Sequence, residues 1–180
     1  MTWKAFHNRG EILRAVIATA DVRRDGILPL DIPGAGEAFH DELDLLGALM
    51  LKWHARMSGH VERELAVQPL DLRAAVATAW ARAAEELAGV RAILDHYREQ
   101  PVDAEMARVI DRAAAKEHQF LAVMAGLSGL GEPDAAAVGA EIERAARLQQ
   151  GVLTLDARAA TDDGPRRASL LDRLRAVVAA

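Results

Sequence analysis

The stretch Gln100-Pro101-Val102-Asp103 separates two long segments whose apolar residues recur at helical spacing. Proline removes a backbone donor and clashes inside a helix, but it is accepted in the first turn. The aspartate two residues later can accept hydrogen bonds from the free N–H groups at a helix start. The stretch therefore predicts the end of one helix and the beginning of the next.

Similar boundaries occur at Gln68-Pro69-Leu70-Asp71 and at Glu132-Pro133-Asp134. Pro69, Pro101, Pro133 and Pro165 follow one another at intervals of 32 residues, which suggests a repeat. The core side chains do not recur at that interval, since Trp80 aligns with Arg112, so we reject a repeat. The proline boundaries predict six helices, over residues 3–23, 36–66, 70–99, 103–127, 134–150 and 166–179.

Composition supports a helical protein. The chain has 180 residues, of which 51% are hydrophobic and only 4% aromatic, and 38 are alanine, which favours helices. Short connections between helices of similar length place consecutive helices antiparallel. We therefore predict an all-α fold, an up-and-down antiparallel bundle of about six helices with a four-helix core plus N- and C-terminal helices.

The last segment is expected to be separate from the bundle. Thr161-Asp162-Asp163-Gly164 is a polar break, and the helix predicted after it has one apolar stripe of Leu170, Leu171, Leu174, Val177 and Val178. We assign residues 1–160 to the bundle domain and residues 161–180 to a linker and an amphipathic helix. The stripe could pack on its own bundle or on a second copy of the chain, and the sequence leaves both open.

Charge and composition narrow the classes of function. The formal net charge is −5, and no basic cluster exceeds a pair such as Arg23-Arg24, so a nucleic-acid partner is not expected. The longest uncharged run, residues 119–131, is too short to cross a bilayer. Charged residues interrupt the N-terminal stretch where a signal peptide would be apolar. We expect a cytoplasmic protein, and the arginine bias of its basic residues fits a GC-rich bacterial genome.

Glu117 is the most anomalous residue in the sequence, because it falls within the apolar stripe of the predicted helix over 103–127. His54 projects within the apolar face of the predicted helix over 36–66, and Glu86 flanks the stripe of the next helix. If these helices alternate in direction, the three residues lie within one turn of each other along the bundle axis. They could form a buried hydrogen-bonded cluster, or the metal site His54, Glu86 and Glu117.

If His54 and Glu117 pair in the interior, we expect substitution of either one alone to destabilise the fold by about 3–5 kcal/mol. The other histidines suggest surface roles. His60 and Glu64 are spaced as a surface helix pair, and His96 and His118 lie away from the apolar centres of their helices.

Glu37-Ala38-Phe39-His40 matches the Glu-x-x-His spacing of ferritin-like di-iron bundles. A ferritin-like bundle would bind iron, manganese or zinc, and we would place that ion near His54, Glu86 and Glu117. The motif occurs once, however, because neither His96 nor His118 has a glutamate three residues before it. A first-turn glutamate and a histidine at a solvated edge explain the same residues.

No catalytic motif for nucleophilic chemistry is present. The chain has no cysteine, and Ser58, Ser128 and Ser169 lie outside any Gly-x-Ser-x-Gly turn. We therefore expect a non-catalytic protein without a cofactor that acts through protein contacts, as a homodimer or other homo-oligomer. The alternatives are a ferritin-like bundle that binds a divalent metal ion and a bundle that holds a small apolar ligand between its helices.

Overall fold

The computed structural model describes the backbone of residues 3–162 and the side chains of residues 9–151. All regular secondary structure in this part of the chain is helical, with seven helices and no strand, which confirms the all-α class. The helices pack as a bundle around one apolar core. Their bounds are α1 (Trp3–Arg23), α2 (Ala35–Ala38), α3 (Glu42–Ala66), α4 (Leu72–Glu86), α5 (Ala88–Glu99), α6 (Ala104–Met124) and α7 (Ala135–Asp162).

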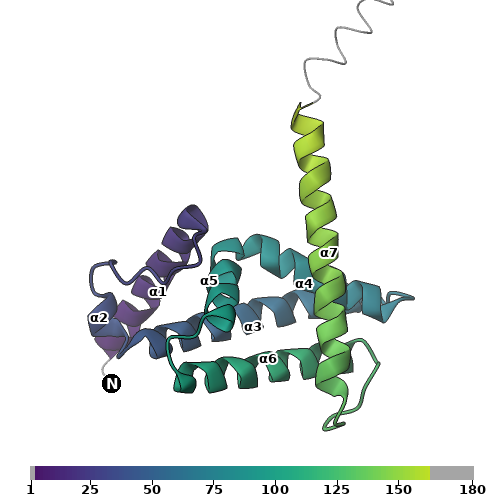
Figure 1. Ribbon diagram of the computed structural model, residues 1–180, viewed down its shortest axis with the longest axis horizontal. Helices are drawn as coiled ribbons and strands as arrows, with labels where there is room; N and C mark the ends of the chain where they lie inside the picture. Colours follow the sequence, from purple (N-terminus) through teal and green to yellow (C-terminus); the bar gives the residue numbers. More distant parts are fainter. Residues whose placement is uncertain (1–2, 163–180) are drawn as a thin grey trace, which may run out of the picture.

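Each helix packs against a small number of neighbours. α3 and α6 extend along the long axis of the molecule, and α4 packs against α3 (Figure 1). α1 and α5 pack on each other at the end nearer the N-terminus. α7 packs on α4 and α6 but stands across them (Figure 1). Within residues 3–162, none of the helices has an apolar stretch long enough to span a lipid bilayer.

The predicted helix starts at the Pro-x-Asp boundaries are confirmed by their caps. The side chains of Asp71 and Asp103 each accept a hydrogen bond from the backbone N–H three residues on, at 2.9 and 2.8 Å. Asp41 caps α3 in the same way at 2.7 Å. Each cap satisfies one of the N–H groups that have no partner within the helix.

Two of the predicted helices are wrong in length, because each is two helices. The segment over 36–66 is interrupted between Ala38 and Glu42, where Phe39 is extended and buried and Asp41 begins α3. The segment over 70–99 is interrupted at Leu87, whose φ of −116° and ψ of 45° leave the helical region. Leu87 is itself buried, so the break lies inside the molecule.

Contact with α1 explains the second break. A Cβ added to Gly89 would lie 2.3 Å from the carbonyl oxygen of Ala20, so α5 and α1 touch backbone to backbone. The backbone N–H of Gly89 also donates to Asp21 Oδ1 at 2.8 Å. The side chain of Asp21 thus satisfies a free N–H in the first turn of α5. The direction of α5 is set by its packing on α1, and no proline marks the change.

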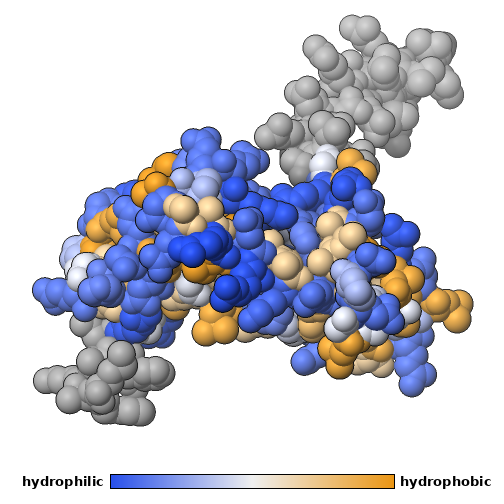
Figure 2. Space-filling view, turned by 60° about the horizontal axis from the view of Figure 1, so that its bottom comes forward, coloured by the Kyte–Doolittle hydropathy of each residue, from blue (hydrophilic) through white to orange (hydrophobic). Residues whose placement is uncertain are grey.

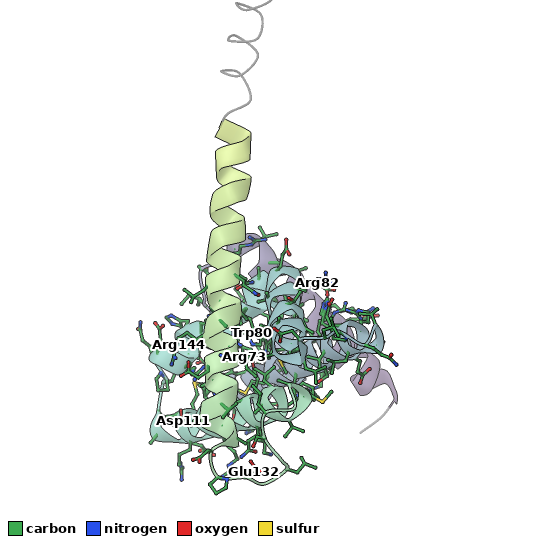
Figure 3. The ribbon with its side chains drawn as sticks, turned by 90° about the vertical axis from the view of Figure 1, so that its right-hand side faces the viewer. Arg73, Trp80, Arg82, Asp111, Glu132 and Arg144 are labelled. Atoms are coloured by element: carbon green, nitrogen blue, oxygen red, sulfur yellow. The ribbon has the colours of Figure 1, made fainter. Side chains whose placement is uncertain are left out.

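α7 is longer than predicted, because it continues to Asp162 and does not end at residue 150. Its outer turns reach beyond the other helices, as a view from the side also shows (Figure 3). The helix includes residues 161 and 162 of the expected linker. The predicted C-terminal helix over 166–179 lies outside the described residues.

The core is formed by the apolar faces of the helices. Trp53 and Trp80 are at most 1% exposed, and several large apolar side chains of α3, α4 and α6 are as deeply buried. The largest fully buried members from these three helices are Trp53, Trp80, Leu45, Leu46, Leu49, Met57, Val61, Val76 and Leu121.

α7 crosses α6 at Gly139, and the crossing leaves no space for a side chain. A Cβ at this position would lie 1.8 Å from the carbonyl oxygen of His118. Glycine therefore permits the two helices to approach closely enough for their polar side chains to meet.

We expect Gly139→Ala to destabilise the fold by about 1–3 kcal/mol, because the added methyl group overpacks the crossing. Gly47→Ala is the matched control, since Gly47 lies within α3 and a Cβ there would meet nothing within 4 Å. The free energy of unfolding of the control variant should rise by about 0.5–1 kcal/mol, because alanine has a higher helix propensity than glycine. Chemical denaturation measures both changes, and equal stability of the two variants would contradict the close crossing.

Candidate functional site

Glu117 lies between two tryptophan side chains from other helices. Trp53 on α3 donates its indole N–H to Glu117 Oε2, and Trp80 on α4 donates to Oε1, both at 2.9 Å. The two indole rings pack edge to face, with centroids 5.5 Å apart. An indole can only donate and an ionised carboxylate can only accept, so the three side chains are complementary. One carboxylate thus joins α3, α4 and α6.

Arg91 on α5 adds a buried positive charge to this arrangement. Its guanidinium lies over the ring of Trp53 at 4.8 Å and near that of Trp80 at 5.8 Å. Its Nη1 is 3.9 Å from Glu117 Oε1, while its Nε and Nη2 donate to Asp95 Oδ1. The electron-rich ring faces and the carboxylates both favour a cation at this place.

α7 closes the arrangement with Arg147 and Glu143. Arg147 lies 4.9 Å over the ring of Trp80, which is beside α7 in Figure 3. Arg147 donates through Nη1 and Nη2 to both oxygens of Asp95, at 2.9 and 2.6 Å, and through Nε to Glu143 Oε1 at 2.8 Å. His118 Nε2 bonds the other oxygen of Glu143 at 2.6 Å. We call these residues from five helices the central cluster: Trp53, Trp80, Arg91, Asp95, Glu117, His118, Glu143 and Arg147.

Two carboxylates of the central cluster, those of Asp95 and Glu143, have pKa values below their ordinary range. Burial alone would raise the pKa of Asp95, but the hydrogen bond from Arg147 and the charge of Arg91 outweigh it and hold the pKa below its ordinary value. Burial likewise opposes ionisation of Glu143, yet hydrogen bonds from His118 and Arg147 hold the pKa of Glu143 far below normal. Because an ionised Glu143 can only accept, His118 Nε2 is the donor in their hydrogen bond.

The central cluster is arranged to hold helices together. Each oxygen of Asp95, Glu117 and Glu143 accepts a hydrogen bond from another member. These oxygens are therefore already occupied as acceptors, and the geometry favours a fixed network of charges.

A cavity of about 310 Å³ lies beside the central cluster. Trp53, Arg91 and Glu117 line it together with apolar side chains of α3, α5 and α6. An apolar surface and charged groups meet around this open space.

The predicted metal residues do not come together. Glu117 lies in the central cluster, but His54 is exposed and packs its ring edge to face on Phe120, with centroids 5.4 Å apart. Glu86 is 39% exposed and pairs with Arg56 at 2.6 Å and with His60 at 2.8 Å. Among the side chains of residues 9–151, no three histidine or acidic groups gather closely enough to hold a metal ion.

His54 and Glu117 both line the cavity, but they do not bond each other. The expected pairing between them is wrong, because both oxygens of Glu117 are bonded by tryptophan and His54 faces outward. The apolar face predicted for this helix is broader than the face that α3 buries, and His54 lies on the part that remains exposed. The binding of a divalent metal ion by the protein remains a prediction.

Two of the other histidines, His60 and His118, also differ from expectation. His118 is 7% exposed and belongs to the central cluster, so its predicted surface position is wrong. His60 bonds Glu86, while the expected partner Glu64 pairs with Arg82 from α4. Within the Glu-x-x-His stretch, the histidine at residue 40 is exposed, as predicted for a solvated edge.

Sequence reasoning missed Arg91, Asp95, Glu143 and Arg147. Arg91 with Asp95, and Glu143 with Arg147, are opposite charges four residues apart on one helix, a spacing that is visible in the sequence. Such pairs are common on exposed helix faces, so the spacing does not indicate burial. Comparison of the chain with protein-family models, curated proteins and solved structures gave no match.

We expect Glu117→Ala to destabilise the protein by about 2–5 kcal/mol, because two buried indole N–H groups lose their acceptor. His54→Ala is the control and should change stability by less than about 1 kcal/mol, since His54 is exposed. Urea denaturation of the two variants measures the difference. Similar losses in both would contradict the hydrogen bonds to tryptophan.

Acid should weaken the central cluster. Because folding lowers the pKa values of Asp95 and Glu143, the unfolded chain takes up protons first as the pH falls. Their contribution to stability is complete above about pH 5 and is lost as the pH falls toward the folded-state values. We expect the Tm to fall on acidification, and to fall less in Glu143→Gln than in the control Glu141→Gln, whose carboxylate is 55% exposed. Thermal unfolding of both variants across this pH range measures how steeply the Tm falls with pH. An equal fall in both variants would contradict the contribution of the Glu143 carboxylate.

Proposed function

We propose that the protein is a non-catalytic helical bundle that acts through protein contacts and forms a homodimer in the bacterial cytoplasm. The support for a non-catalytic role is that the polar groups of the central cluster satisfy one another. The support for protein contacts is an exposed apolar surface at one end of the bundle.

That surface, the loop patch, comes from the connections between α3 and α4 and between α6 and α7. Leu70 and Leu130 are more than nine-tenths exposed. A Cβ at Gly126 would lie 3.4 Å from a methyl carbon of Leu72, which shows that the two connections are neighbours. Figure 2 shows apolar side chains gathered at the corresponding, right-hand end of the molecule. The loop patch consists of Val67, Leu70, Leu72, Leu127 and Leu130.

A second copy of the chain is the partner that fits the loop patch best. In a two-fold contact the same surface meets itself, so an apolar surface is complementary to its own copy without opposite charges. Exposed apolar surface of this kind marks protein contacts, because leaving it in water is unfavourable. The helix predicted over 166–179 remains a second candidate for the same dimer.

We expect the full chain to sediment with about twice its mass of 19.4 kDa. Leu70→Ser with Leu130→Ser should give the single-chain mass, because the apolar contact is lost. Val22→Ser with Leu148→Ser is the control, since these two residues are also exposed but lie outside the loop patch. A single-chain mass for the unaltered protein would contradict the homodimer. A dimer that survives the loop-patch substitutions but is lost on deletion of residues 165–180 would place the contact in the C-terminal segment instead.

A further inference from the structure

The cavity beside the central cluster has an apolar floor. Trp53, Leu94 and Ile110 line it and are all at most 6% exposed. They come from α3, α5 and α6, so the space lies between helices of the bundle, where small-molecule sites are commonly found. The floor can take an apolar group out of water.

The charged groups of the floor are compensated within the protein. Glu117 and Glu143 line the cavity, but tryptophan, histidine and arginine donors already bond their oxygens. Arg91 also lines it, and it bonds Asp95 through two nitrogens. A ligand is therefore not needed to neutralise the interior.

The rim has basic groups that are more exposed than the charged groups of the floor. His54, Arg98 and Lys116 line the cavity and are exposed. Arg98 Nη1 forms an ion pair with Glu143 Oε2 at 3.6 Å, a separation longer than a hydrogen bond, so its N–H groups can still donate to a ligand. Lys116 has no ion pair or hydrogen bond with the described residues. The two acids that line the cavity are at most 13% exposed, so the rim presents basic groups to solvent.

The size of the cavity limits the ligand. At about 310 Å³ the cavity is at the small end of the range of ligand pockets, so a small molecule fits it best. A molecule of that size with an apolar body and one negative group matches both the floor and the rim.

We propose that this cavity binds a small monocarboxylate with an apolar body of about eight carbon atoms, with the body over Trp53 and the carboxylate at Arg98 and Lys116. The inference is independent of the proposed homodimer, because the loop patch and the cavity share no residue.

Calorimetric titration of the full chain with octanoate tests the proposal. 1-Octanol has the same body without the charge, octylamine has the opposite charge, and acetate has the carboxylate without the body. We expect octanoate to bind at least tenfold more tightly than each of the other three, because charge-assisted hydrogen bonds and apolar burial are both required. Equal binding of octanol or octylamine would overturn the proposal, and so would no binding of octanoate.

Variants then locate the site. Arg98→Gln with Lys116→Gln should weaken octanoate binding about tenfold, as expected for lost charge-assisted bonds. Lys52→Gln with Arg112→Gln removes the same charge from exposed residues outside the cavity and should leave binding unchanged. Ala114→Leu should abolish binding by filling the space, with thermal unfolding used to verify its fold. Unchanged binding in the rim variant, or in a folded Ala114→Leu variant, would overturn the assignment.

Nuclear magnetic resonance of the unaltered protein gives a readout that needs no variant. The indole N–H resonance of Trp53 should shift on addition of octanoate, because Trp53 lines the cavity. The backbone resonances of Leu70 and Leu130 in the loop patch should not shift. Shifts confined to the loop patch would overturn the cavity as the site.

Discussion

The hydrogen bonds from Trp53 and Trp80 to Glu117 are the interaction on which the arrangement of the helices depends. A carboxylate away from water is unfavourable by several kcal/mol unless donors surround it. The donors here come from α3 and α4, while the carboxylate belongs to α6. The three helices can therefore reach a low free energy only in the register that brings these three side chains together. Apolar packing alone is less demanding, because similar side chains can exchange places across a core.

The rest of the central cluster extends the same requirement to α5 and α7. Asp95 receives hydrogen bonds from Arg91 within α5 and from Arg147 on α7, and His118 joins α6 to α7 through Glu143. These polar contacts require close helix crossings, and the glycine at 139 supplies one of them by letting α7 touch the backbone of α6. The cavity lies beside this network, and three charged residues of its lining, Arg91, Glu117 and Glu143, are members of the central cluster. The loop patch is at a connection between helices and is built from separate residues.

The sequence allowed the helical class and most helix starts to be predicted, because proline and aspartate act locally. The break at Leu87 could not be predicted in this way, since it results from the packing of α5 on α1. Glu117 could be identified as anomalous from its position on an apolar stripe, but its partners could not. A tryptophan at a core position looks the same in the sequence whether or not its N–H has an acceptor. His54 was misplaced because helical spacing predicts a face and not how much of that face is covered.

The most direct measurement of the central claim is hydrogen exchange at the indole nitrogens of Trp53 and Trp80, followed by nuclear magnetic resonance. If Glu117 accepts from both in the interior, the two protons exchange only when the protein opens, and they exchange at similar rates. Exchange of either proton at the rate of an indole in water would contradict the account. It would show that the carboxylate of Glu117 does not join these helices in solution.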